Sequence, residues 1–229
     1  MISVIMPAYQ EAQALPDCLL ELFESQPVGE CWVIDASEAA EFEAMDAQLQ
    51  KTIDRPYLHY VAAELKGRAR QMNQGANLSS GAILLFLHAD TRLPENAFSQ
   101  IQSAIDSGAH WGRFDVSFDH PGHVYRMIAG LMNWRSRKSG IATGDQALFM
   151  TRGAFDLAGG YDDIPLMEDI AICRKLKTIG SPACLEAQVK TSARRWEEKG
   201  VYRTIVLMWW LRFAYWAGVS PQRLSDWYR

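Results

Sequence analysis

The chain has 229 residues, 48% of them hydrophobic and 22% charged, with a formal net charge of -4 at pH 7. This length suffices for one large hydrophobic core or two small ones. The negative balance argues against general affinity for nucleic acid, because binding a phosphate backbone requires a basic surface. The cysteines stand far apart and form no C-x-x-C pair, which indicates reduced structural residues rather than a disulfide framework or a zinc site. They are Cys18, Cys31, Cys173 and Cys184.

The apolar segments of the chain indicate a protein that does not span a membrane. The first residues, MISVIMPAY, lack the basic and long apolar segments of a secretory signal. The longest apolar region covers residues 204–220, and Arg212 interrupts it. Neither half approaches the ~20 residues that a spanning helix requires. We therefore expect a cytoplasmic protein, with the inner face of the cytoplasmic membrane as an alternative location.

Short apolar runs alternate with helical patterns over the first half of the chain. Four runs bounded by polar or turn residues are predicted to be strands, at residues 3–7, 31–35, 58–62 and 83–88. Helices are predicted at residues 15–25, 39–50 and 68–78, with a further one beginning at Pro94. Strands separated by helices of this length indicate an α/β fold with a mostly parallel, Rossmann-like sheet flanked by helices.

The pattern changes after residue 110. Residues 111–118 alternate as in an edge or antiparallel strand, and residues 147–151 are predicted to form another strand. Residues 124–134 and 169–179 are predicted to be helices. No proline- or glycine-rich linker and no internal repeat interrupts the chain. We therefore predict one domain over residues 1–229, with two lobes that meet near residue 110.

Three of the predicted strands are followed by polar or acidic residues. These are Pro7, Tyr9 and Glu11 after the first strand, Asp35 and Ser37 after the second, and His88, Asp90 and Thr91 after the fourth. Ligands of open parallel sheets bind beyond the carboxyl ends of the strands. Asp and Ser also cap helices, which is the alternative interpretation of each residue alone. Three such strand ends together favour a binding site.

The absence of several motifs narrows the kind of site. The sequence contains no G-x-G-x-x-G or G-x-x-x-x-G-K-[ST] motif, so dinucleotide and P-loop chemistry have no support. A G-x-S-x-G elbow is also absent, which argues against an α/β-hydrolase. Asp90 on a loop is a hard oxygen ligand suited to Mg²⁺ or Mn²⁺ on a diphosphate. Such a metal would neutralise charge on a leaving diphosphate.

An ordered set of segments resembles the family-2 glycosyltransferases of the GT-A fold. The set begins with SVIMPAYQEA, VIDAS, GRARQMNQGA and LLFLHADTRLP. It continues with GDQALFM, GGYDDIPLMEDIAICRKL and ARRWEEKG, and so covers nearly the whole chain. HADTRLP, WGRFDV, GDQ, PLMED and the Trp-rich tail are similar to a short bacterial subgroup named for arsenosugar biosynthesis, also called radical-SAM/selenodomain-associated transferases.

The resemblance implies a reaction and a division of the chain. The reaction is inverting transfer of a sugar from a nucleotide-diphosphate donor, of UDP or GDP type, to a hydroxyl of a small-molecule or lipid-linked acceptor. Residues 1–110 would form the nucleotide-sugar-binding half, residues 111–200 a mixed acceptor and catalytic half, and residues 201–229 an aromatic helical tail. Mn²⁺ or Mg²⁺ is the implied cofactor.

The resemblance also assigns a donor site. Its residues are Pro7, Tyr9, Glu11, Asp35, Gly67, Arg68, His88, Ala89 and Asp90. Asp35 would accept a hydrogen bond from the base, although only Ala36 separates it from Ser37, fewer residues than the family usually shows. Asp90 matches the metal-binding acid. His88 replaces the family's first aspartate. Its imidazole would contact the metal, the ribose or a phosphate, and a structural hydrogen bond at the strand end is the alternative. An exposed helix face is the alternative for Arg68 and for Arg70.

Catalytic and acceptor residues are implied in the second half of the chain. Asp169, with Glu168 in the ED motif, matches the general base, and a helix cap is the alternative for this aspartate. The acceptor residues implied are Trp111, Arg113, Gly144, Asp145, Gln146, Arg195 and Trp196. A charged solvent-facing stretch is the alternative for Arg195 and Trp196.

Two further functions and three roles for the tail stay open at this point. A nucleotidyltransferase of similar fold is disfavoured by the ED motif and by the lack of a glycine-rich loop bearing lysine near the N-terminus. A non-catalytic nucleotide-sugar-binding homologue is disfavoured by the presence of Asp90, Asp169 and GDQ. The aromatic tail fits a peripheral helix on anionic lipid, a helix of the second-lobe core, or a homodimer interface.

Overall fold

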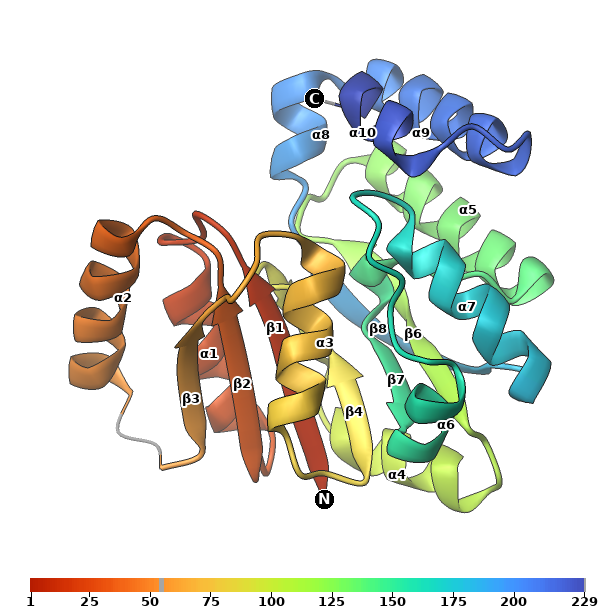
Figure 1. Cartoon of the computed structure of the whole chain (residues 1–229). Coiled ribbons are helices and arrows are strands. Elements are labelled where there is room, and N and C mark those ends of the chain that lie inside the picture. Colours follow the sequence, from red (N-terminus) through yellow and green to blue (C-terminus); the bar gives the residue numbers. More distant parts are fainter. Residues whose placement is uncertain (54–55, 229) are drawn as a thin grey trace.

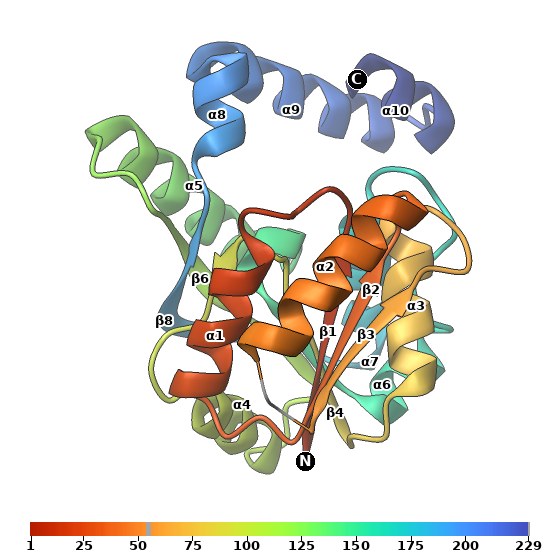
Figure 2. The ribbon, with the colours of Figure 1, turned by 90° about the vertical axis from the view of Figure 1, so that its left-hand side faces the viewer.

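The computed structural model describes residues 1–53 and 56–228, except the side chain of Arg195. An eight-stranded sheet in the order β3-β2-β1-β4-β7-β6-β8-β5 runs through the molecule, with helices packed on both of its faces (Figure 1). The last three helices, α8, α9 and α10, lie together at one end of the molecule, beyond the ends of the strands (Figure 2).

The first half of the sheet is parallel, as predicted. It consists of β1 (Ile2–Ala8), β2 (Glu30–Asp35), β3 (Leu58–Ala62) and β4 (Ile83–Phe86). Every residue of β4 is buried, which fits a strand covered on both faces. β4 ends at Phe86, so Leu87 and His88 belong to the following loop and not to the strand predicted over residues 83–88.

Alternate residues of β1 belong to two separate cores. Val4 and Met6 pack into the larger core, together with residues of α1 (Leu15–Ser25), α2 (Ala39–Thr52) and α4 (Ala97–Asp106). Ile5 packs into a second core with residues of α3 (Arg68–Leu78), α6 (Arg152–Leu157) and α7 (Glu168–Ile179). This alternation follows from the two-residue period of a strand and places the two groups of helices on opposite faces of the sheet.

The second half of the sheet is mixed. β7 (Leu148–Thr151) pairs antiparallel with β4, and β6 (Trp111–Phe118) pairs antiparallel with β7. β8 (Ala183–Thr191) lies parallel to β6, and the short β5 (Thr91–Arg92) pairs antiparallel with β8. The bounds predicted for the strand at residues 111–118 are therefore correct. It is antiparallel on one side only, and it lies inside the sheet rather than at its edge.

Several helix boundaries differ from their predictions by a few residues. α1 and α3 match, and α2 extends to Thr52 rather than residue 50. α4 begins at Ala97, three residues after Pro94, because Asn96 takes a left-handed conformation with φ 58°. α5 (His123–Ser139) continues one turn beyond residue 134 and ends at Gly140, which has φ 66°.

Three helices end the described chain, and the last two of them pack on α7. They are α8 (Arg194–Lys199), α9 (Val201–Trp216) and α10 (Pro221–Tyr228). Leu211, Ala214 and Leu224 are buried against Met167 and Ile170 in a small cluster of their own. Trp209 and Trp216 of α9 are 72% and 74% exposed, whereas Tyr215 of the same helix packs against this cluster. The core interpretation of the tail therefore holds for its inner face only.

No helix within residues 1–53 and 56–228 combines the length and the apolar character needed to cross a bilayer.

Candidate active site

A cavity of about 730 Å³ lies at the carboxyl end of β1. Loops after β1, β2 and β4, the loop before α3, the 3₁₀ helix η1 (Gly144–Gln146) and the start of α8 form its walls. Most of the predicted donor residues line it, together with two of the predicted acceptor residues. These are Pro7, Tyr9, Glu11, Gly67, Arg68, His88, Ala89, Asp90, Asp145 and Trp196. The structure thus brings together residues from separate segments of the sequence.

Among the side chains that the structure describes, three cations border this cavity, which suits it to an anionic ligand. Arg68 begins α3, and Lys66 lies two residues earlier with its Nζ 5.5 Å from the ring centre of Tyr9. Arg194 contributes from α8, where its Nη2 is 3.3 Å from Glu11 Oε2. Between Lys66 and Arg68, Gly67 has φ 136°, a conformation that favours glycine. Lys66 was not predicted as a site residue, since no spacing rule singles out a lone exposed cation, whereas Arg194 belongs to the ARRWEEKG segment that resembles the family.

His88 is held by the GDQ segment. Its Nδ1 lies 3.2 Å from Asp145 Oδ1, and its ring lies directly against Gly144. A Cβ atom at Gly144 would stand 2.4 Å from His88 Nε2, closer than any real contact. Position 144 therefore has to be glycine for the imidazole to sit beside Asp145. The structure places the carboxylate of Asp145 beside the His88 ring at the cavity wall, a neighbour that the sequence left open.

The two acids of the ED motif have different surroundings. Glu168 is buried, and its Oε1 lies 3.2 Å from Arg68 Nη1. Burial raises the pKa of Glu168, and the neighbouring charge of Asp169 raises it further, while Arg68 acts in the opposite direction. Asp169 is half-buried at the second position of α7, where its Oδ1 accepts a hydrogen bond from Ile170 N at 2.8 Å. Glu168 is thus engaged by Arg68, whereas Asp169 keeps part of its carboxylate accessible.

A small cavity connects the ED motif to the donor residues. It has a volume of about 10 Å³ and is lined by His88, Gly144, Glu168 and Asp169, among others. His88 and Arg68 also line the large cavity, so the two cavities share walls. The predicted base therefore lies next to the predicted donor site.

Asp35 does not line the large cavity. Its Oδ1 accepts a hydrogen bond from Ser37 N at 2.8 Å, and its Oδ2 accepts one from the Tyr60 hydroxyl. Burial and this hydrogen bond to Asp35 raise the pKa of Tyr60. The neighbouring Ala36 borders the cavity in place of Asp35. Both carboxylate oxygens of Asp35 therefore have protein partners at the turn after β2.

Arg70 lies on an exposed face of α3, in agreement with the alternative considered for it. Its Nε is 2.6 Å from Asp163 Oδ1, and its Nη2 is 2.8 Å from Asp163 Oδ2. This two-pronged ion pair satisfies the Arg70 guanidinium, so the position of the side chain is explained without a bound ligand.

Three of the predicted acceptor residues are structural instead. Trp111 and Gln146 have no exposed surface, and Arg113 is 1% exposed. The indole Nε1 of Trp111 donates to Gly180 O at 2.8 Å. These side chains have no surface left for an acceptor, and the expectation that they face one does not fit the structure. The side chain of Arg195, also predicted, lies outside the described part of the chain.

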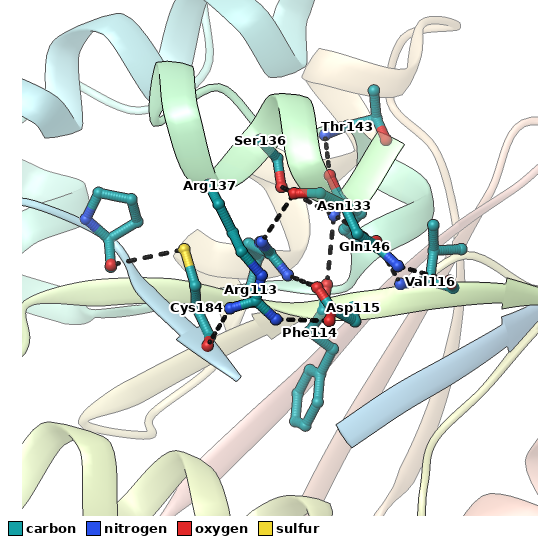
Figure 3. Close-up of polar contacts among 11 residues, drawn as sticks. Arg113, Phe114, Asp115, Val116, Asn133, Ser136, Arg137, Thr143, Gln146 and Cys184 are labelled. Atoms are coloured by element: carbon teal, nitrogen blue, oxygen red, sulfur yellow. Dashed lines mark hydrogen bonds and ion pairs between the residues drawn. The ribbon is translucent and has the colours of Figure 1, made fainter. Parts of the chain in front are cut away.

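Arg113 and Gln146 belong to a buried polar network between β6, α5 and η1 (Figure 3). Arg113 pairs with Asp115, whose other carboxylate oxygen lies 2.5 Å from Arg137 Nη2. Gln146 Nε2 donates to Asn133 Oδ1 at 3.3 Å, and Gln146 Oε1 accepts from the backbone N–H of Thr143 at 3.3 Å. The network fixes η1 to the sheet and so positions Asp145 at the cavity.

The residues around Asp90 fit a metal ion that would be bound mainly through the phosphates of the enzyme's substrate. Within the described residues, no group of three His, Cys, Asp or Glu side chains gathers closely enough to hold a metal ion. Asp90 is half-buried at the cavity wall, and its Oδ1 accepts a long hydrogen bond of 3.4 Å from Thr91 Oγ1. Mg²⁺ is commonly held by one or two carboxylates together with substrate phosphates and water, and this site offers that number of ligands.

Comparisons with known proteins agree with this geometry. The family model described as "Glycosyl transferase family 2" matches residues 3–156, more than half of the chain. No curated protein matches the chain.

Many solved structures resemble the chain, and two of them illustrate the likeness. S. aureus TarS 1–349 has a TM-score of 0.62 and 13% identity, over 84% of this chain and 60% of that one. The mannosyltransferase PcManGT from Pyrobaculum calidifontis, in complex with GDP-Man and Mn²⁺, has a TM-score of 0.64 and 18% identity, over 82% and 56%. This chain thus spans somewhat more than half the length of either structure. The predicted GT-A fold is confirmed, and the chain belongs to glycosyl transferase family 2.

Proposed function

We propose that this chain catalyses inverting transfer of a sugar from a nucleoside-diphosphate donor to an acceptor hydroxyl. The observation that carries the proposal is the meeting of Arg68, His88 and the ED motif around adjoining cavities. Three cations at the larger cavity would bind the diphosphate, and Asp169 borders the smaller cavity beside it. The site therefore combines an anion-binding wall with a carboxylate base.

The reaction assigns a separate task to each group. The acceptor oxygen attacks the anomeric carbon, the bond from that carbon to the diphosphate breaks, and Asp169 takes the hydroxyl proton. Attack on the face opposite the leaving group inverts the anomeric centre. Arg68 lies against Glu168 and so connects the diphosphate side to the ED motif. A divalent metal held by Asp90 would neutralise negative charge on the leaving diphosphate.

A donor screen tests this proposal. UDP, GDP and their common sugar conjugates are added to the protein with and without Mn²⁺, and thermal unfolding is followed. A true donor at about 100 times its Kd should stabilise the fold by about 2.7 kcal/mol through mass action. Release of nucleoside diphosphate in an acceptor mixture then identifies transfer. Stabilisation by no nucleoside diphosphate, or release of pyrophosphate from a nucleoside triphosphate, would exclude the proposal.

Gly144→Ala should weaken the reaction without unfolding the protein. The new methyl group has to displace the His88 ring, because it would stand 2.4 Å from Nε2. A misplacement of about 1 Å near the reacting centre costs up to about 100-fold, so we expect kcat/KM to fall roughly 10- to 100-fold. Gly153→Ala is the matched control, because a Cβ atom there meets nothing within 4 Å. An unchanged kcat/KM in Gly144→Ala would show that the reaction does not depend on the position of the His88 ring.

The exposed face of α9 supports peripheral contact with a membrane, which we propose as part of the function. This face carries Val206, Trp209, Trp210, Phe213 and Trp216, each at least 54% exposed. Aromatic residues of this kind favour the headgroup region of a bilayer. Co-sedimentation with anionic phosphatidylglycerol vesicles should show binding that Trp209→Ser with Trp216→Ser reduces. Absence of vesicle binding together with a concentration-dependent dimer would assign the face to a homodimer instead.

A further inference from the structure

Gln71 is a buried polar residue at the large cavity that the proposed reaction does not use. It is the fourth residue of α3, a helix that packs against β1 and β2 (Figure 1). The residue lines the large cavity and is only 4% exposed. A glutamine is seldom buried to this extent, because its amide has to find hydrogen-bond partners there. The question is which of those partners the protein itself supplies.

The nitrogen of the Gln71 amide is fully occupied by the protein. Its Nε2 donates to Ala8 O and to Ile34 O, each at 2.7 Å. These two carbonyl oxygens belong to the carboxyl ends of β1 and β2. Only an N–H group can donate to two carbonyl oxygens, so the orientation of the amide is fixed by its contacts. Gln71 thus ties α3 to two neighbouring strands through both of its amide hydrogens.

The oxygen of the Gln71 amide is an acceptor without a protein partner. Among the described residues, nothing donates a hydrogen bond to Oε1, and this oxygen is not one of the side-chain atoms that are sealed from solvent without a partner. Oε1 therefore has to reach the surface, and the surface that Gln71 lines is that of the large cavity. Tying the strands together explains the position of Nε2 but leaves Oε1 as a fixed acceptor in the cavity wall.

This acceptor lies on the side of the cavity where β2 ends. In the sheet, β1 separates β2 from β4, and His88 follows β4. His88 shares the small cavity with Asp169. A sugar nucleotide that places its sugar beside Asp169 would extend its base toward β2, because the diphosphate and the ribose lie between sugar and base. The cavity wall also includes Tyr9, whose half-exposed ring can stack on a base.

Asp35 is not available to a base at this place. Its two carboxylate oxygens accept hydrogen bonds from Ser37 N and from the Tyr60 hydroxyl, and it does not line the large cavity. Gln71 instead presents an unoccupied acceptor between the ends of β1 and β2. A fixed acceptor selects a ligand that brings a donor to it. Uracil and guanine carry such a donor as a ring N–H, whereas cytosine and adenine have a lone pair at the corresponding ring nitrogen.

We propose that Gln71 recognises the base of the sugar nucleotide, by accepting a hydrogen bond from the ring N–H of uracil or guanine at its Oε1. Cytosine or adenine would place a second acceptor against this oxygen and leave both without a donor. A site built to bond an N–H group rejects analogues that lack it. The inference rests on the proposed transfer reaction for the chemical class of the ligand, and it assigns base recognition to Gln71 instead of Asp35.

Nucleotide selectivity tests this role, and it does not depend on transfer. The Kd values of UDP, CDP, GDP and ADP are measured by calorimetry with Mn²⁺ present, for the wild type, Gln71→Met and Gln74→Met. The wild type should bind UDP roughly 10- to 100-fold more tightly than CDP, or GDP than ADP, according to the size of base that the cavity takes. In Gln71→Met the two affinities should agree within about threefold, because a thioether is only a weak acceptor.

Gln74→Met is the matched control, three residues further along α3. The Gln74 amide also ties the helix to the backbone, because its Nε2 donates to Ala62 O at 3.1 Å and its Oε1 accepts from Glu64 N at 2.9 Å. Both of its polar atoms thus have protein partners, so this variant should keep the selectivity of the wild type. Gln71→Lys is a second test variant. Its ammonium retains donors for the two strand carbonyls but has no acceptor, so it should also lose the selectivity.

Each outcome of the experiment decides the proposal. Equal affinities within both pairs of nucleotides in the wild type would overturn it. So would a selectivity that Gln71→Met leaves unchanged, even if both affinities fell, because Gln71 would then be purely structural. An equal loss of selectivity in Gln74→Met would also contradict it. Selective binding without sugar transfer would retain the role of Gln71 and reject the reaction, whereas transfer with unselective binding would do the reverse. Binding of none of the four nucleotides would contradict both.

Discussion

Asp169→Asn is expected to lower kcat for sugar transfer by about 10²- to 10⁴-fold, the range that general-base catalysis contributes. The amide of asparagine cannot take the acceptor proton. Its oxygen can still accept the hydrogen bond that Asp169 Oδ1 receives from Ile170 N, so the start of α7 should be preserved. Donor affinity, measured by calorimetry, should stay within about twofold of the wild type, so that the loss is confined to the chemical step.

Asp163→Asn is the matched control for this experiment. Asp163 lies on the segment that leads into α7, and its partner is the exposed Arg70. Exposed ion pairs contribute at most about 1 kcal/mol to stability, so the control should keep both fold and activity. An undiminished rate in Asp169→Asn would exclude Asp169 as the base. Equal losses of rate and donor affinity would assign it to binding.

Asp115→Asn is expected to destabilise the fold by about 3–5 kcal/mol, because it leaves Arg113 buried without a counter-charge. Arg113 is 1% exposed, and its ion-pair partner is Asp115 (Figure 3). Arg137, which shares the same carboxylate, would add repulsion between the two guanidinium groups. The midpoint of urea unfolding measures this change, provided that the slope of the transition is unchanged.

Asp156→Asn is the control for the buried pair, because Asp156 is an exposed residue of α6. Its substitution should change stability by less than about 0.5 kcal/mol. A destabilisation below about 1 kcal/mol in Asp115→Asn would show that the buried charges do not depend on one another. It would also reopen a ligand-binding role for Arg113.

The parallel half of the fold could be predicted because its signals are local. β4 is a continuous apolar run, and the helix at residues 68–78 has a clear 3.6-residue pattern. Once four parallel strands are inferred, their carboxyl ends must meet at one edge of the sheet. The order of strands and helices along the chain is therefore enough to place Pro7, His88 and Asp90 together.

The acceptor side could not be predicted in the same way, because its residues are set by distant packing. β8 has no continuous apolar run, and most of its residues are partly exposed. Arg113 resembles a ligand-binding arginine in sequence, and only its contact with Asp115 shows that it is structural. Sequence patterns report which residues follow a strand, not which charges a tertiary fold buries.

The anchoring of η1 has a consequence for the kinetics of local opening. The amide of Gln146 bonds to Asn133 and Ser136 in the interior, and Ala147 N donates to Gly144 O at 3.2 Å. Breaking this turn would expose part of the main core, so the Ala147 amide should exchange with deuterium only through global unfolding. Amides of α9, which packs through a separate small cluster, should exchange through a smaller opening. Asp145 would then stay in place at the wall of the large cavity during transient detachment of the tail.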